Sequence, residues 1–232
     1  MNIVLIHGQN HKGSTYHIGR MIAEKVTVEK EITEFFLPKD LNHFCLGCYK
    51  CIEGDHNCPF YGVKKNIMDA VEAADLLIFT TPTYCLRASA PMKSFIDLTF
   101  TYWMSHKPRK CMFSKQAIVI STAAGAGAGS AVKDIANTLF YWGVPVVKKY
   151  AVAVQAMSWE EVKPKKKASI EKDIDKIAKS ISFNKVCVGI KTKFLFSAMR
   201  MMQNKGWGAS VEEKEYWSKN GWLNKARPWN NK

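Results

Sequence analysis

The sequence contains no long apolar run, since no stretch approaches the ~18 residues that a membrane-spanning helix requires. Its start also lacks the basic segment and the small-residue cleavage site of a secretory signal, because Met1 and Asn2 lead directly into IVLIHG. We therefore expect an intracellular, cytoplasmic protein without a membrane partner. Cysteines remain thiols in that compartment, so clustered cysteines indicate metal or redox chemistry more often than structural disulfides.

Acidic residues are scarce, with 20 Asp and Glu against 34 Lys and Arg and a net charge of +14. The imbalance lies mainly in residues 148–232, which carry 19 of the basic residues and only 8 of the acidic ones. Such a surface suits nucleic acid, anionic lipid or an acidic partner, but a solvated lysine-rich surface explains it equally simply. We expect no nucleic-acid partner.

Two common phosphate-binding signatures, G-x4-G-K-[ST] and G-x-G-x-x-G, are absent. What the chain has instead is an alternation of short apolar runs with segments of helical periodicity. The predicted strands are residues 2–8, 31–37, 75–84, the start of 116–130, and 144–154, and the predicted helices are 18–26, 63–74, 91–104 and 131–143. This order predicts an α/β domain over residues 1–155, with an open five-stranded parallel sheet and helices on both faces.

Residues 156–232 have a different character. They contain two candidate amphipathic helices, 169–181 and 193–203, and a polar tail with Trp217, Trp222 and Trp229. Exposed tryptophan is unfavourable in so polar a tail. We therefore expect a basic helical extension that packs on the sheet domain or on a neighbouring subunit.

Three loops leave the carboxyl ends of predicted strands, where ligands bind in open parallel sheets. The first offers backbone N–H groups at a helix start and side-chain donors for a phosphate, and the other two can frame a flat ring. Each alone is also explained as an ordinary strand-end turn or flexible loop, but together they match the shape of flavin mononucleotide (FMN). The candidate residues are Gln9, His11, Gly13, Ser14, Thr15 and Tyr16 in the first loop, Pro82, Thr83, Tyr84, Cys85 and Leu86 in the second, and Ser121, Thr122, Ala123, Ala124 and Gly125 in the third.

The motifs GQNHKGST, PTYCLRASAPMKSFID and STAAG, taken in this order, resemble those of the flavodoxin-like NADPH-dependent FMN reductases. The resemblance covers residues 1–155 and is nearest to the branch that includes the iron–sulfur flavoproteins. It implies a flavodoxin-like fold, bound FMN, and homodimers or homotetramers in which a neighbouring subunit completes the flavin site. Two features depart from the pattern: Gln9 and His11 replace the common Ser and Arg, and the Asp-Asp pair that often follows the last cysteine is missing.

Four of the seven cysteines, Cys45, Cys48, Cys51 and Cys58, form a C-x2-C-x2-C-x6-C run between the first two motifs. Such spacing can ligate a 4Fe–4S cluster, and iron–sulfur flavoproteins resemble this segment closely. Zinc is chemically possible but crowded, because it prefers two separated pairs. A loop that holds no metal and lies near the flavin is an equal alternative, and the sequence leaves the choice open.

Three functions are consistent with these features. The first is an FMN-dependent NAD(P)H oxidoreductase that passes electrons to a small-molecule or protein acceptor; it requires no general acid or base, so we name no catalytic residue. The second is an electron carrier with FMN and a cluster, reduced by an acidic ferredoxin that binds the basic C-terminal third. The third is a non-enzymatic binding module that uses the basic tail.

Overall fold

Alternate residues of the buried strands face opposite sides of one sheet, and this alternation divides the core in two. The computed structural model describes residues 1–26, 29–181 and 186–230. Its parallel strands are β1 (Asn2–His7), β2 (Glu31–Phe36), β3 (Leu76–Tyr84), β5 (Gln116–Ala123) and β6 (Val146–Ala153). Their order in the sheet is β2-β1-β3-β5-β6, which is the flavodoxin-like order. The predicted fold class is therefore confirmed.

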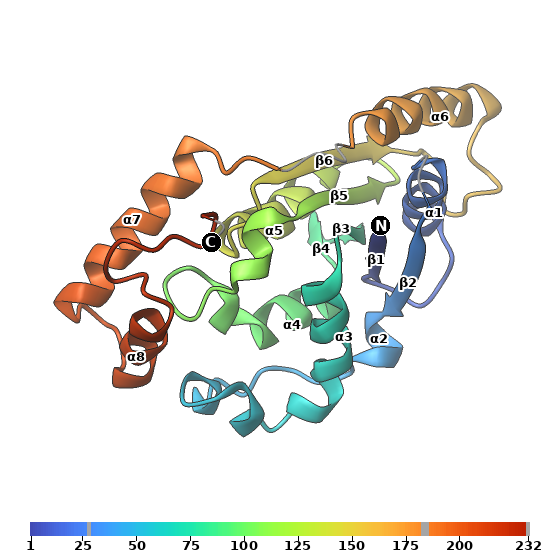
Figure 1. The fold of residues 1–232 in the computed structure, drawn as a ribbon. Helices are drawn as coiled ribbons and strands as arrows, with labels where there is room; N and C mark the ends of the chain where they lie inside the picture. Colours follow the sequence, from blue (N-terminus) through green and yellow to red (C-terminus); the bar gives the residue numbers. More distant parts are fainter. Residues whose placement is uncertain (27–28, 182–185, 231–232) are drawn as a thin grey trace.

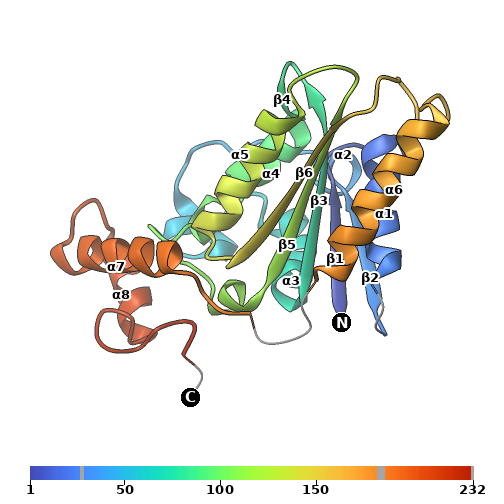
Figure 2. The ribbon, with the colours of Figure 1, turned by 90° about the horizontal axis from the view of Figure 1, so that it is seen from above.

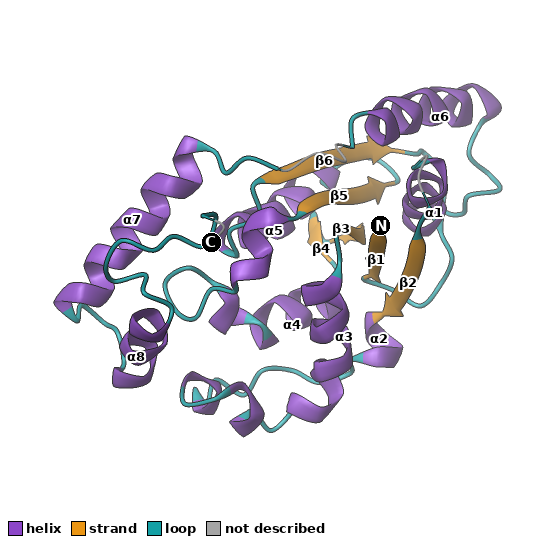
Figure 3. Cartoon of the chain, viewed as in Figure 1, coloured by secondary structure: helices purple, strands orange, loops and turns teal. Residues whose placement is uncertain are grey.

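Helices cover both faces of this sheet, as Figure 2 shows from above and Figure 3 shows by element type. They are α1 (Ser14–Lys25) and α6 (Pro164–Lys179) on one face, and α3 (Tyr61–Ala73), α4 (Ala90–Leu98) and α5 (Ala128–Tyr141) on the other. On the first face Ile3 and Leu5 pack with Ile18 and Ile174. On the second face the core contains Phe79, together with Phe95 and Trp142.

Helix α5 ends at Tyr141 with Trp142 as its C-cap, two residues before the predicted end, and Gly143 follows the cap. Its φ of 94° is a left-handed conformation that glycine adopts without steric cost. The Gly143 N–H donates to the Phe140 carbonyl and the Val144 N–H to the Leu139 carbonyl, which satisfies two carbonyls of the last turn.

Other boundaries differ from the sequence prediction. Strand β3 ends at Tyr84, the end of its predicted range, but pairs with a short antiparallel strand, β4 (Arg87–Ala88), in a segment predicted as loop. Helix α4 ends at Leu98, well before the predicted residue 104. The short helix α2 (Leu37–Asp40), which follows β2, was also not predicted.

The C-terminal extension contains α6, α7 (Ile190–Lys205) and α8 (Val211–Lys219). Helix α6 packs on α1 through the first core. Helices α7 and α8 lie beyond the α5 face of the sheet, where Phe196, Trp217 and Trp222 pack with Phe113 and with Met104. The division into domains 1–155 and 156–232 stays a prediction, and residues 182–185 and 231–232 of the extension lie outside the described part. No helix among the described residues is long and apolar enough to cross a bilayer.

His7 ends β1 and is almost completely buried, at 1% exposure. Its Nδ1 lies 2.8 Å from Thr80 Oγ1 and its Nε2 lies 2.9 Å from Glu34 Oε2, so the ring connects β1 to both neighbouring strands. Burial lowers the pKa of the imidazole below its ordinary value of 6.5, although the Glu34 carboxylate opposes this shift. His7 is therefore neutral in the folded chain near neutral pH.

The burial of neutral His7 predicts that the folded chain loses stability as the pH falls. Below about pH 6.5 the unfolded chain takes up a proton on His7 while the folded imidazole stays neutral, so the free energy of unfolding falls until the lower folded pKa is passed. We expect His7→Asn to be less stable at neutral pH but to lose less stability between about pH 7 and 5. Urea unfolding across this range measures both effects. His56→Asn, at an exposed ring, is the control, and an unchanged pH dependence in His7→Asn contradicts the assignment.

Candidate functional site

The three loops predicted to bind a ligand leave the same edge of the sheet. Strand pairing aligns His7 with Thr80, Thr80 with Ile120, and Pro82 with Thr122, so the carboxyl ends of β1, β3 and β5 lie side by side. The Gly8 N–H donates to the Thr80 carbonyl at 2.7 Å and extends the first pairing by one residue. The candidate residues near the strand ends are buried or half-buried, and those at the loop tips are exposed.

The first loop runs into α1, which begins earlier than predicted, at Ser14. Gly13 is the N-cap, no side chain caps the helix, and the first turn contains no acidic residue. The backbone N–H groups of the first turn are therefore available to an anion, and the helix dipole favours one there. Ser14 and Thr15 are 8% and 7% exposed and lie in this same turn. The loop is thus arranged as an anion site.

His11 and Gln9 contribute differently to this loop. A Cβ on Gly13 would lie 2.9 Å from His11 Cδ2, so the imidazole ring packs against the Gly13 backbone. The His11 side chain is exposed and that of Gln9 is half-buried. Tyr16 in the first turn of α1 lies within 5.1 Å of the His7 ring, measured between centroids, and so joins the buried histidine to the loop.

Ser89, which the sequence did not single out, joins the first loop to the second. Its Oγ donates to the Gly8 carbonyl at 2.8 Å, and its N–H donates to Thr81 Oγ1 at 3.0 Å. The residue is fully buried. A buried hydroxyl satisfied in this way holds two loops at a fixed separation, since breaking either bond leaves a buried polar group without a partner.

The second loop is a tight turn between β3 and β4. Thr83 pairs with Ala88 and Tyr84 with Arg87, which leaves Cys85 and Leu86 as its two central residues. Both have positive φ, 48° and 63°. Turns of this kind favour asparagine and glycine, and bulky residues there cost of order 1–3 kcal/mol each. Such strain is typical of binding sites, where surrounding contacts hold the backbone in place.

The third loop packs directly on the second. Thr83 Oγ1 lies 2.9 Å from Ser121 Oγ, and the Ser121 hydroxyl also donates to the Thr81 carbonyl at 2.7 Å. Gly127, with φ of 95°, lies so near the turn that a Cβ there would come within 2.8 Å of Leu86 Cα. This approach places the exposed tip, Ala124 and Gly125, beside the strained turn.

The cysteine run forms a loop before α3 with two short 3-10 helices, Lys50–Ile52 and Asp55–Asn57, and all four cysteines are among the residues that line one small pocket. Cys45 and Cys48 are exposed, Cys58 is half-buried, and Cys51 is buried. Burial raises the pKa of the Cys51 thiol, against the opposing effect of the Lys64 ammonium. Among the described residues, no three His, Cys, Asp or Glu side chains are arranged to hold one metal ion.

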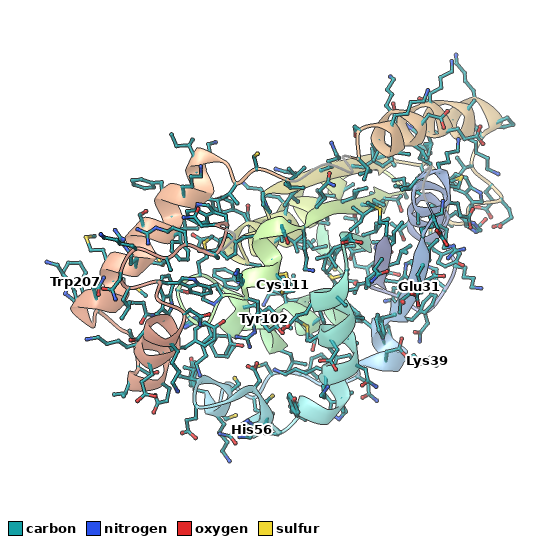
Figure 4. All side chains as sticks on the ribbon, in the orientation of Figure 1. Glu31, Lys39, His56, Tyr102, Cys111 and Trp207 are labelled. Atoms are coloured by element: carbon teal, nitrogen blue, oxygen red, sulfur yellow. The ribbon has the colours of Figure 1, made fainter. Side chains whose placement is uncertain are left out.

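Basic residues far away in the sequence hold this cysteine loop, and sequence reasoning missed them. The Lys107 ammonium donates to the Ile52 carbonyl, and the Arg109 guanidinium pairs with Asp55. Arg109 lies over the Tyr102 ring, 4.5 Å from its centroid; Figure 4 labels Tyr102, and His56 on the cysteine loop. The loop is therefore fixed to the segment between α4 and β5 by buried cations.

Comparison with known proteins gives one family and two relatives. A family model described as NADPH-dependent FMN reductase matches residues 1–158. Two iron–sulfur flavoproteins of Archaeoglobus fulgidus are 29% identical, over 98 residues (42% of this chain, 48% of the relative) and over 123 residues (53% of each). The chain thus spans about half the length of the curated relatives that it matches.

Solved structures of flavin reductases share the fold. An NADH:FMN oxidoreductase in its apo form gives a TM-score of 0.54 at 21% identity, covering 79% of this chain and 91% of the other. An azoreductase from Bacillus anthracis gives 0.60 at 14% identity, covering 78% of this chain and all of the other. At these identities the likeness concerns the fold alone.

The contact between the second and third loops gives a stability prediction. In Gly127→Ala the new Cβ meets the Leu86 backbone and requires a strained φ, so we expect a loss of about 1–3 kcal/mol in the free energy of unfolding. Gly129→Ala is the matched control, because nothing lies within 4 Å of its Cβ position and α5 gains about 0.4–1 kcal/mol. Urea unfolding measures both, and equal stability of the two variants contradicts the described packing.

Proposed function

The chain belongs to the family of NADPH-dependent FMN reductases, and from this premise we propose that it is an FMN-dependent NAD(P)H oxidoreductase whose flavin lies on the three loops described above. The observation that carries the proposal is the meeting of these loops at one sheet edge, fixed by Ser89 and by the Thr83–Ser121 pair. The family match favours this function over a non-enzymatic binding module.

The N-terminus of α1 supports a site for the phosphate of FMN. Its first-turn N–H groups have no side-chain cap, and the hydroxyls of Ser14 and Thr15 add donors at the same place. Lys12 adds positive charge on this loop, where its ammonium lies 5.3 Å from the Tyr16 ring centroid. This set of backbone, hydroxyl and ammonium groups fits a doubly charged phosphate monoester even though Gln9 and His11 replace the common Ser and Arg.

The second and third loops support a site for the flavin ring. In this proposal one wall of the ring site consists of Pro82, Thr83, Tyr84, Cys85 and Leu86, and the other of Ser121, Thr122, Ala123, Ala124 and Gly125. The turn at Cys85 and Leu86 and the small residues after Ala123 leave backbone groups near both walls, which suits the polar edge of a heterocycle. Tyr84 and Leu86 are 44% and 61% exposed and offer apolar surface that excludes water from a ring.

When bound, FMN supplies the redox chemistry, accepting hydride from NAD(P)H and passing electrons to a second acceptor. The residues of this chain bind, orient and shield the flavin. His7 beneath the first loop is neutral, so it adds no positive charge next to the phosphate loop. The exposed apolar surface of Tyr84 and Leu86 also supports a homodimer or homotetramer in which a second subunit covers the site. The acceptor, a small molecule or a protein, and the cytoplasmic location stay predictions.

A second candidate function adds a 4Fe–4S cluster on Cys45, Cys48, Cys51 and Cys58. The observation that favours it is that all four cysteines are among the residues lining one small pocket, and the two Archaeoglobus relatives carry the name iron–sulfur flavoprotein. The thiols of the described loop are not gathered around a single ion. In this candidate the chain is an electron carrier that an acidic ferredoxin reduces through the basic C-terminal third.

Removal of the hydroxyls tests the phosphate site. We expect Ser14→Ala/Thr15→Ala to weaken FMN binding by two to four powers of ten, because each lost hydrogen bond to a charged group is worth roughly 1.5–3 kcal/mol. The dissociation constant follows from titration of the apoprotein with FMN. Ser169→Ala, at an exposed position of α6, is the control. Full flavin retention in the double variant shows that the loop is wrongly assigned.

Anaerobic purification followed by iron and sulfide analysis separates the two candidates. A cluster predicts iron and sulfide in equal amounts, lost in Cys45→Ser and retained in Cys187→Ser, an exposed cysteine outside the loop. Absence of both elements removes the second candidate and leaves the first intact. Reduction of the flavin by NADH or NADPH in the same sample tests the first directly.

A further inference from the structure

Helix α7 has two apolar faces, and only one of them packs against other described residues of the chain. Its inner face packs in the aromatic cluster of the extension, where Phe196 and Gln203 are fully buried and Met199 is half-buried. The Gln203 amide also donates to the Ser105 carbonyl at 3.0 Å. These contacts attach the helix to the sheet domain and account for its inner face.

The outer face of α7 carries a second apolar row. Ile190, Phe194 and Met201 are 83%, 76% and 50% exposed. At about 100° per residue they fall within about 40° of arc, roughly opposite Phe196 and Gln203. The described part of the chain leaves this row exposed, and large exposed apolar side chains that share one face mark an interaction site.

Two further exposed apolar side chains follow the end of α7. Trp207, directly after the helix, is 56% exposed, and Val211 at the start of α8 is 71% exposed. Figure 4 shows Trp207 at the end of α7 that points away from the sheet, and Figure 1 shows α7 at the outer edge of the molecule. We call Ile190, Phe194 and Met201, which share the outer face of α7, the outer apolar row.

Cations flank the outer apolar row on both sides. Helix α7 contains no Asp or Glu. On the helical wheel Lys191 and Lys205 lie on one side of the row, and Lys193 and Arg200 lie on the other. The nearest exposed acidic side chains along the chain are Glu212 and Glu215 on α8, and Glu215 lies 3.7 Å from Lys219. The row therefore lies within a positively charged surface.

An apolar row flanked by cations could bind three kinds of partner, and the combination favours one of them. A second copy of the chain would bring the same cations together across a two-fold axis, which is unfavourable. An acidic protein would pair with the cations but would set carboxylates against the apolar row. An anionic bilayer satisfies both parts, because its phosphates meet the cations while its interfacial region accepts the apolar side chains, tryptophan included.

We propose that α7 binds the surface of anionic phospholipid membranes, lying in the plane of the bilayer with its outer apolar row inserted at the boundary between headgroups and acyl chains. The basic C-terminal third suits anionic lipid among other partners, but the expectation was that the tryptophans of the tail dock on the protein and that no membrane partner binds. Trp217 and Trp222 are indeed buried, but Ile190, Phe194 and Met201 lie on a face of α7 that remains exposed when the tail packs on the sheet domain. The proposal is independent of the flavin site.

Sedimentation of the full chain with vesicles tests the proposal. We expect binding to vesicles of phosphatidylcholine with phosphatidylserine, little binding to phosphatidylcholine alone, and weakening by salt. Phe194→Ser/Met201→Ser should lower the partition coefficient by about tenfold or more without loss of folding, because both side chains are exposed. Met157→Ser, at a side chain that is 89% exposed and lies outside α7, should bind like the wild type.

Two double variants that remove positive charge test whether the cations beside the outer apolar row contribute to membrane binding. Lys191→Gln/Lys193→Gln should weaken binding to the anionic vesicles about tenfold, whereas Lys165→Gln/Lys172→Gln on α6 should change it less than threefold. Equal losses in the two pairs mean a non-specific effect of net charge and overturn the proposal.

Three further results would overturn it. One is wild-type binding to anionic vesicles that does not depend on Phe194 and Met201. Another is binding to soluble polyglutamate but not to vesicles, which indicates an acidic protein partner. The third is an oligomer in lipid-free solution that Phe194→Ser/Met201→Ser dissociates, which assigns the row to a contact between copies.

Discussion

Parallel pairing of β1, β3 and β5 is the constraint on which the candidate site depends. Because the strands run in one direction and in a fixed register, His7, Thr80 and Ile120 align, and the three loops must leave the sheet together. The Gly8 N–H to Thr80 carbonyl bond carries this register beyond the end of β1. A slip of one residue would turn every core side chain to the other face, so the buried core fixes the position of the site.

Order at the loop tips comes from contacts between loops rather than from turn propensity. Cys85 and Leu86 adopt positive φ, which neither residue prefers. The turn is held by its pairing to β4 and by the close approach of Gly127 to Leu86. Ser89 then fixes the first loop to the second through the Gly8 carbonyl. Local strain is stabilised by buried contacts, as expected where a backbone is prepared for a ligand.

The sequence was sufficient for the strands and for the positions of the loops, because runs such as Ile3–Ile6 are apolar on both faces and only a covered parallel sheet buries them. It was insufficient for features that arise from distant contacts. Nothing near Cys85 indicates a two-residue turn, and nothing near Lys107 indicates that it holds Ile52. Helix α8 is a different case, because Ser210 and Glu213 form a capping box that is readable in the sequence and was overlooked.

The cations behind the cysteine loop bear on its chemistry under either candidate function. Lys64, Lys107 and Arg109 are all largely buried beside this loop. Lys64 and Lys107 donate to backbone carbonyls, of Leu98 and Ile52, so their charge is not cancelled by a bonded carboxylate as that of Arg109 is by Asp55. A positive charge that no carboxylate neutralises stabilises negative charge nearby, and the Lys64 ammonium by itself lowers the pKa of the Cys51 thiol. Burial outweighs this effect and raises the pKa of the Cys51 thiol, so the three cations act mainly by holding the cysteine loop in place.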